Sequence, residues 1–342
     1  MTKIKVEDAI GIRLAHDITE IRPGEFKGPS FRRGHRVREQ DVCRLMRLGK
    51  RHLYILDLED DQVHEDDAVM EMAAALAGPG VSFSGLPKEG KLQLTAAYAG
   101  LFKINTHALV EFNLMPDVMC AAIHDNVPVT RGQIVAGTRA IPLVIKRQTL
   151  DDALSLADKA APIFSVKAYH RKNIRLVITG NEVYEGLIED RFENIVRSKL
   201  QALGASLLET VILPDDPERI ADAIRNMAAA DTDMIITTGG MSVDPDDVTR
   251  HGIRQAGVDK IYYGAAVLPG AMFQLSYKNE MPIMGIPACG LYHKTTVFDL
   301  VLPRLLAGER LDERDLARFA VGGLCLDCEV CRYPKCPMGK TG

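Results

Sequence analysis

The sequence has no long hydrophobic run and no excess of basic charge. A membrane-spanning helix needs roughly 20 consecutive apolar residues, and no stretch of the 342 residues approaches that length. Residues 1–8 lack the apolar core of a secretory signal. The formal net charge is −4, which provides no electrostatic footprint for nucleic acid. We therefore expect a cytoplasmic protein with neither a membrane nor a nucleic-acid partner.

Cysteine is sparse over most of the chain and concentrated near its end. Three of the seven cysteines, Cys43, Cys120 and Cys289, stand alone, and the other four fall within residues 325–336. A secreted disulfide framework would spread its cysteines along the chain. The distribution instead favours a reducing compartment and a metal site near the C-terminus.

Changes of periodicity, punctuated by glycine and proline, divide the chain into four predicted parts. We expect a mixed N-terminal domain over residues 1–80 and a β-rich domain or insertion over residues 81–148. The short apolar run at residues 108–110 is interpreted as strand. An α/β domain over residues 170–310 and a Cys-rich metal-binding tail over residues 321–342 follow.

The α/β domain has the clearest pattern. Continuous apolar runs alternate with segments of helical periodicity, as in a doubly wound, mostly parallel sheet with helices on both faces. Asp216 precedes a proline and is the predicted N-cap of one of these helices. The strands are predicted over residues 174–178, 207–213, 234–237, 260–267 and 282–286, and the last helix near residues 292–308.

Three loops follow predicted strands and are the places to look for chemistry, because open α/β sheets bind ligands at the carboxyl ends of their strands. The loops are residues 179–182, 238–249 and 287–290. The second begins Thr-Thr-Gly-Gly, and glycine lets backbone N–H groups approach a phosphate closely.

Carboxylates follow these glycines in the second loop. Asp244, Asp246 and Asp247 would repel a phosphate unless a hard cation such as Mg²⁺ lay between them. The alternative is that Gly239-Gly240 makes a plain turn and Asp247 caps the next helix.

Taken together, the loops resemble the molybdopterin-binding domain of molybdenum cofactor biosynthesis proteins, above all the molybdopterin molybdotransferases and the C-terminal part of gephyrin. The resemblance is strong over residues 170–305 and implies the molybdopterin-binding α/β fold. It is carried by 179–182 (Thr-Gly-Asn-Glu), 239–243 (Gly-Gly-Met-Ser-Val), 247–249 (Asp-Val-Thr, also similar to molybdopterin adenylyltransferases), 285–290 (Gly-Ile-Pro-Ala-Cys-Gly), Asp190 and Asn194.

The resemblance implies roles for these residues. Asp247 would hold Mg²⁺ at the ligand phosphates, helped by Asp244 or Asp246, with Glu182 as a second carboxylate across the cleft. The residues implied to bind molybdopterin or its adenylate are Thr179, Gly180, Asn181, Asp190, Asn194, Thr238, Gly239, Gly240, Ser242, Pro287, Ala288, Cys289 and Gly290.

The chain also departs from the molybdotransferase pattern. The segment at residues 268–271 is Leu-Pro-Gly-Ala where the family has Lys-Pro-Gly-Lys, so both cations are missing. Pro245 replaces an aspartate, and no separate C-terminal β domain is expected. Cys289 is interpreted as a packed thiol rather than a ligand, and residues 64–67 as a helix cap rather than a metal cluster.

The four C-terminal cysteines form a second motif. Cys325, Cys328, Cys331 and Cys336 read C-x2-C-x2-C-x4-C-P, close to the run that holds a [4Fe–4S] cluster in ferredoxins. Zinc is the alternative, although its usual layout separates two Cys-x2-Cys pairs by a longer spacer. Adventitious metal binding is the third interpretation.

Three functions fit this sequence. The first is a Mg²⁺-dependent transferase that inserts molybdenum or tungsten into adenylylated molybdopterin and releases AMP. The second is a non-catalytic cofactor carrier or redox-sensing module serving a molybdoenzyme or tungstoenzyme client. The third is a nucleotide pyrophosphatase or deamidase of the competence-damage type, which shares the Thr-Gly-Gly loop. By resemblance we expect a homo-oligomer, as a dimer.

Overall fold

The computed structural model describes residues 2–55, 58–88, 90–241 and 248–340. The chain divides into two compact units. The first comprises residues 1–97, 104–123 and 132–165, and the second comprises residues 98–103, 124–131 and 166–342. Among the described helices, none combines the length and apolar character needed to cross a bilayer.

The N-terminal part of the first unit is a small mixed α/β arrangement around one apolar cluster. That cluster is centred on the buried Val6, Ile18, Phe31, Val37 and Leu45. Its elements are the antiparallel pair β1 (Thr2–Lys5) and β4 (His52–Ile55), the hairpin β2 (Ile18–Arg22) and β3 (Phe26–Phe31), the short η1 (Val6–Asp8) and helix α1 (Glu39–Arg47).

The rest of the first unit combines an antiparallel sheet with three helices. The strand order is β6-β7-β11-β9, and a separate pair joins β12 to β5. The elements are β5 (Gln62–His64), α2 (Glu65–Leu76), β6 (Val81–Phe83), β7 (Lys91–Ala96), α3 (Thr106–Leu114), β9 (Val118–Ala122), β11 (Ile134–Ala140), β12 (Val144–Lys146) and α4 (Arg147–Lys159).

The interpretation of residues 108–110 as strand is wrong, because they lie inside α3. The side chain of Asn105 caps this helix by accepting a hydrogen bond from the Ala108 amide at 3.1 Å. Ala108 and Phe112 are buried one turn apart, so packing selects the helix where a short apolar run is ambiguous.

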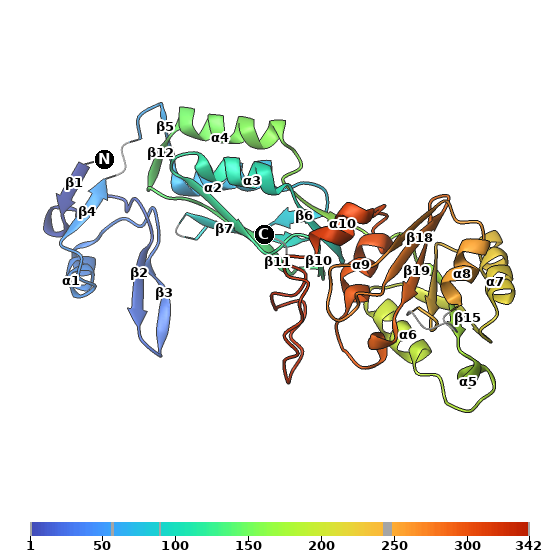
Figure 1. Cartoon of the computed structure of the whole chain (residues 1–342). Coiled ribbons are helices and arrows are strands. Elements are labelled where there is room, and N and C mark those ends of the chain that lie inside the picture. The colour runs from blue at the N-terminus through green and yellow to red at the C-terminus, as the bar shows by residue number, and fades with distance from the viewer. Residues whose placement is uncertain (1, 56–57, 89, 242–247, 341–342) are drawn as a thin grey trace. The chain divides into compact units, whose positions relative to one another are not determined.

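A six-stranded sheet forms the centre of the second unit (Figure 1). The strand order is β15-β14-β16-β19-β18-β17; the first four strands are parallel, and the last two join as antiparallel partners. The strands are β14 (Asn173–Thr179), β15 (Ser206–Leu213), β16 (Met234–Thr238), β17 (Lys260–Tyr263), β18 (Gln274–Lys278) and β19 (Met281–Ile286). The predicted doubly wound, mostly parallel sheet is confirmed, and β18 is a strand that the sequence pattern did not reveal.

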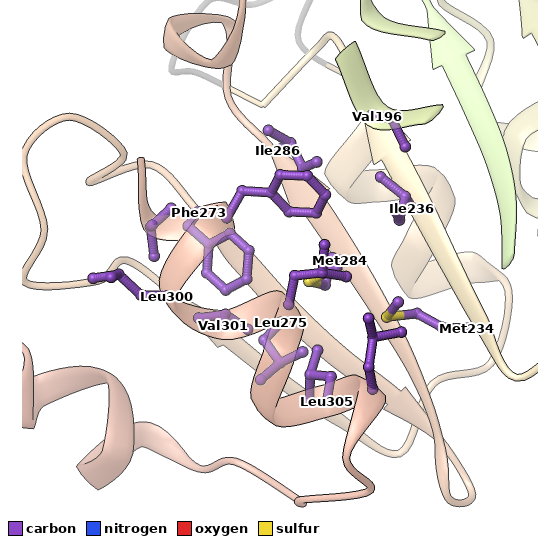
Figure 2. Close-up of a cluster of buried hydrophobic side chains, with 14 of the residues drawn as sticks. Val196, Met234, Ile236, Phe273, Leu275, Met284, Ile286, Leu300, Val301 and Leu305 are labelled. Carbon is purple, nitrogen blue, oxygen red and sulfur yellow. The ribbon is translucent and has the colours of Figure 1, made fainter. Parts of the chain in front are cut away.

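Helices cover both faces of this sheet because its central strands are apolar on both sides. Val177, Ile235 and Ile283 pack against α7 (Pro217–Ala229) and α8 (Thr249–Gln255). The residues that follow them in the strands belong to the opposite cluster, with α6 (Phe192–Ala202) and α9 (Val297–Leu306). Figure 2 shows Met234, Leu275 and Met284 of the sheet near Val301 and Leu305 of α9, and Ile236 beside Val196 of α6, on this face.

The last long helix begins later than the sequence pattern predicts. Thr296 is its N-cap, and Thr296 with Asp299 forms a reciprocal capping box, so α9 starts at Val297. Residues 292–295 therefore remain a connecting loop after the short turn η2 (Ala288–Leu291). This loop follows the third predicted ligand loop directly.

A buried ionic cluster holds the C-terminal end of α9. Glu309 lies 2.8 Å from Lys103 of β8 (Gly100–Ile104) and 2.7 Å from Arg304, which also pairs with Asp315 of α10 (Glu313–Arg318). Burial alone would raise the pKa of Glu309. The hydrogen bond from Lys103 and the charge of Arg304 outweigh that effect and lower the pKa to about 2. The cluster therefore contains an ionised carboxylate at every physiological pH.

Candidate functional site

The three predicted ligand loops leave the sheet at the same edge. In the parallel register, Ile178 pairs with Thr238, and Thr238 pairs with Ile286. The strands β14, β16 and β19 therefore end side by side. The residues that begin the three loops, Thr179, Gly239 and Pro287, therefore lie at neighbouring strand ends, as their positions after parallel strands predict.

Three buried threonines connect two of these loops. The Thr179 hydroxyl lies 2.6 Å from the Thr249 hydroxyl and 3.1 Å from the Thr238 carbonyl oxygen. Thr238 and Thr249 are fully buried, and Thr179 is 3% exposed. We call Thr179, Thr238 and Thr249 the threonine cluster. It joins the end of β14 to the start of α8 across the end of β16.

Gly239 and Gly240 are held against this cluster. Both have positive φ angles, +83° and +52°, which strain any residue with a side chain. A Cβ atom at Gly239 would collide with the Thr179 carbonyl oxygen, and one at Gly240 with the Thr249 hydroxyl. The two glycines are therefore required by the fold of the site itself, whatever ligand they approach.

The Thr238 side chain is the unusual member of the cluster. Its hydroxyl oxygen is buried and has no hydrogen-bond partner among the described residues. Buried hydroxyl groups in folded proteins are nearly always paired, so an exception needs an explanation. An unpaired hydroxyl beside two glycines at the end of a parallel strand is suited to contact a bound polar group.

The first loop is shaped by a pair of reciprocal hydrogen bonds. The Asn181 amide donates to the Asp215 carboxylate at 3.0 Å, and the Asp215 amide donates to the Asn181 side-chain oxygen at 3.0 Å. This pairing uses the Asn181 side-chain oxygen to hold the first loop against Asp215. Glu182 lies in the short helix α5 (Asn181–Tyr184) with an exposed side chain, so its carboxylate remains accessible. Gly180 is buried at the start of this loop.

Asp190 and Asn194 lie at the beginning of α6. The two carboxylate oxygens of Asp190 accept hydrogen bonds from the Phe192 and Glu193 amides at 3.0 and 2.9 Å. Asp190 therefore acts as a cap for the helix. Asn194 is exposed on the first turn of α6.

The third loop, residues 287–290, presents no charged side chain to the site. Pro287 is buried, Ala288 is exposed, and Cys289 and Gly290 are half-buried. Burial raises the pKa of the Cys289 thiol, which keeps it protonated at neutral pH.

Four of the predicted site residues, Ser242, Asp244, Asp246 and Asp247, lie outside the described residues. The structure does describe both flanks of that segment. Met241 is buried, and its carbonyl oxygen accepts a hydrogen bond from the Tyr263 hydroxyl at 3.0 Å. Arg250 stacks on the Tyr263 ring with its guanidinium carbon 3.5 Å from the ring centroid.

Arg250 is a candidate that the sequence analysis missed. The buried Nε of its half-buried side chain has no partner in the part of the chain that is described. It follows the Asp-Val-Thr motif directly, and that position is the one signal that could have identified it. A guanidinium at this place supplies the positive charge that a phosphate needs.

The four C-terminal cysteines line one cavity. Its volume is about 220 Å³, and its wall includes Cys325, Cys328, Cys331 and Cys336 together with residues 292–295. Thr295 and Cys331 are hydrogen-bonded, with Oγ1 and Sγ 3.2 Å apart, and this contact lowers the pKa of the Cys331 thiol. All seven cysteines are free. In the part of the chain that is described, no three His, Cys, Asp or Glu side chains already converge closely enough to hold a metal ion.

Family models match two segments of the chain. Residues 175–307 match the family described as "Probable molybdopterin binding domain", and residues 3–57 match a family described as a domain of unknown function. The first match covers all three candidate loops.

Individual relatives match parts of the chain. A molybdopterin molybdenumtransferase of Synechococcus elongatus is 22% identical over 201 residues, covering 54% of this chain and 50% of the relative. A CinA-like protein of Thermosipho melanesiensis is 39% identical over 83 residues, covering 24% of this chain and 20% of the relative. The chain thus spans half or less of the length of these curated relatives.

Solved structures similar to this chain include MoaB of Thermus thermophilus, described as a molybdopterin biosynthesis enzyme. The two chains are 19% identical with a TM-score of 0.35, and the match covers 40% of this chain and 98% of that one. The tungsten cofactor synthesizing protein MoaB of Pyrococcus furiosus is 17% identical with a TM-score of 0.34, covering 40% of this chain and 98% of that one. Together with the motifs and the sheet, the family match identifies residues 175–307 as a molybdopterin-binding domain of the molybdenum cofactor biosynthesis family.

Proposed function

We propose that this chain binds molybdopterin or its adenylate at the strand-end loops of the second unit. The observation that carries the proposal is the buried Thr238 hydroxyl beside Gly239 and Gly240, which has no hydrogen-bond partner among the described residues, in a domain of the molybdopterin-binding family. A phosphate oxygen would supply the missing hydrogen-bond acceptor. The half-buried guanidinium of Arg250 would balance part of its charge.

We further propose that the bound molecule is processed by metal insertion with release of AMP. Asp247, with Asp244 or Asp246, would hold Mg²⁺, because carboxylate oxygens are the ligands that this cation prefers. When bound, Mg²⁺ would neutralise the charge of the phosphates. Glu182, exposed at the neighbouring loop, would be the second carboxylate. Molybdate or tungstate would be the substrate.

The carrier function is the main competitor, and one observation favours it. The loop at residues 268–271 has no lysine. Two backbone hydrogen bonds join this loop to the C-terminal tail. The Cys325 amide donates to the Leu268 carbonyl oxygen, and the Leu268 amide donates to the Gly323 carbonyl oxygen, each at 2.8 Å. A tail in this position would take the place of the cationic segment. The protein would then hold the cofactor for a molybdoenzyme or tungstoenzyme client.

The four cysteines of the tail complete the proposal. Their spacing in the sequence is the basis for proposing a [4Fe–4S] cluster, with zinc as the alternative. Such a cluster suits the reducing, cytoplasmic setting expected from the cysteine distribution.

The similarity to CinA-like proteins over 83 residues keeps a nucleotide-processing function as the third proposal. It predicts hydrolysis of ADP-ribose, which a molybdenum-inserting enzyme or a carrier would leave intact. The same purified protein can be tested with both substrates.

The deciding experiment measures the release of AMP from adenylylated molybdopterin. Anaerobically purified protein is mixed with adenylylated molybdopterin, Mg²⁺ and molybdate, alongside the variants Asp247→Asn and Glu182→Gln. Molybdate-dependent AMP release that is lost in Asp247→Asn supports the transferase. Binding without AMP release supports the carrier, and equal rates in wild type and Asp247→Asn would remove Asp247 from the reaction.

A further inference from the structure

The first unit contains a cavity of its own, with a volume of about 810 Å³. One wall is the hairpin of β2 and β3 together with Arg32 and Arg33, which follow it. The other walls are the first turns of α2 and residues 86–88, between β6 and β7. Small-molecule sites typically have volumes of roughly 300–1,000 Å³, so the cavity has the size of a ligand site.

One arginine holds the carboxylates of this cavity. The Arg33 backbone amide donates to the Asp17 carboxylate at 2.7 Å. The Arg33 guanidinium lies 3.4 Å from the Asp66 carboxylate and 3.5 Å from the Asp67 carboxylate. Asp66 also accepts a hydrogen bond from the Gly90 amide at 3.2 Å. The acids of the wall are therefore engaged by Arg33 and by a backbone amide.

Three further cations line the same cavity and are not engaged in this way. Lys27, Arg32 and Lys88 are exposed, and among the described residues none of these side chains has an ion pair or a hydrogen bond. A single exposed cation is ordinary, but several on one concave surface focus the potential that attracts an anion. A guanidinium also matches the geometry of phosphate oxygens, with which it forms paired hydrogen bonds.

The cavity also has an apolar wall. Met70, Leu86 and Pro87 belong to it, and Leu86 is 82% exposed. Carbon atoms of a ligand that covered these side chains would remove apolar surface from water. Cations together with an apolar wall therefore suit an organic anion better than an inorganic one.

We propose that this cavity binds a small organic phosphate. Lys27, Arg32 and Lys88 contact the phosphate groups, and the organic part lies against Met70 and Pro87. The hairpin and both arginines belong to residues 3–57, the segment that matches a domain of unknown function, so the proposal gives that segment a class of ligand. It is independent of the pterin site proposed for the second unit.

The first experiment measures binding to the full chain by titration calorimetry without divalent cations. The probes are inorganic pyrophosphate, ADP and citrate, a carboxylate anion of comparable charge. We expect ADP to bind at least as tightly as pyrophosphate, because the apolar wall adds contacts, and citrate to bind more weakly than either. Added salt should weaken the binding of all three.

Variants place the ligand in the cavity. Lys27→Gln, Arg32→Gln and Lys88→Gln should each raise the dissociation constant of ADP by about two- to fivefold, the range for exposed charges. Asp67→Asn removes a negative charge from the wall and should lower the dissociation constant by about twofold. The matched control is Lys146→Gln, an exposed lysine of the same unit, which should bind ADP as the wild type does.

Four results would overturn the proposal. The first is no binding of pyrophosphate or ADP, and the second is binding that the cavity variants leave unchanged. Binding that is lost in Thr238→Val but kept in the cavity variants would place the phosphate at the strand-end loops instead. Citrate that binds as tightly as ADP would overturn the assignment to phosphate. None of these results decides the proposed pterin binding, which AMP release tests separately.

Discussion

Replacing Thr238 by valine should make the protein more stable and its ligand binding weaker. Valine has nearly the shape of threonine but lacks the hydroxyl, and the Thr238 hydroxyl is buried without a partner among the described residues. An unpaired buried polar group costs about 1–3 kcal/mol. We therefore expect Thr238→Val to raise the free energy of unfolding of the ligand-free protein by about 1 kcal/mol.

The effect on binding has the opposite sign. If the Thr238 hydroxyl donates to a phosphate, it contributes about 1.5–3 kcal/mol, the range for hydrogen bonds to charged groups. Its loss raises the dissociation constant for adenylylated molybdopterin by roughly 10- to 150-fold. Urea unfolding and titration calorimetry on the same preparations measure the two effects.

Thr210→Val is the matched control. The Thr210 hydroxyl is likewise buried without a partner in the described part of the chain, but it lies within β15, before that strand ends at Leu213. We expect the same gain in stability and no change in affinity. A loss of stability in Thr238→Val would mean that its hydroxyl has a partner. An unchanged affinity would show that the hydroxyl does not contact the ligand.

Three further predictions concern stability. Gly239→Ala should lower the free energy of unfolding by about 2 kcal/mol or more. Its φ of +83° and the nearby Thr179 carbonyl oxygen leave no room for a Cβ atom. In the same urea titrations Gly186→Ala, where φ is also positive but nothing lies within 4 Å of the added Cβ, should lower the free energy of unfolding less. The pKa of Glu309 is lowered to about 2 in the folded state. Its ionised form therefore contributes about 2 kcal/mol, after allowance for screening, to the free energy of unfolding. This contribution is present above pH 4.5 and is lost as the pH falls towards 2, so acid unfolding of Glu309→Gln should lack it. Burial and the nearby Arg33 charge lower the pKa of His64 below 6.5. The unfolded state therefore binds the proton more readily, and the free energy of unfolding should decrease as the pH drops below 6.5. In His64→Gln, unfolding curves measured between about pH 5 and 8 should show a weaker dependence on pH.

Much of the second unit follows from local sequence. The apolar runs at residues 174–178 and 234–237 coincide with buried strands of the sheet, because only a strand covered on both faces tolerates a continuous apolar segment. Asp216 caps α7 as predicted, accepting hydrogen bonds from the Glu218 and Arg219 amides. The alternation of strands and helices along the chain is enough to place the three ligand loops at one edge of the sheet.

Other features depended on residues far apart in the chain. Thr179 and Thr249 are 70 positions apart, and nothing local indicates that their hydroxyls meet. The pairing of Asn181 with Asp215 and the attachment of the tail to Leu268 are of the same kind.

The physical reason is the range of each interaction. Hydrophobic periodicity, caps and cysteine spacing express contacts between neighbours in sequence, so the sequence by itself determined the parallel strands of the sheet, the loops at its edge and the four-cysteine motif. Which hydroxyl stays unpaired, which glycine lies against a carbonyl and which loop adjoins the cysteines are decided when distant segments pack together. These features only the tertiary structure could decide.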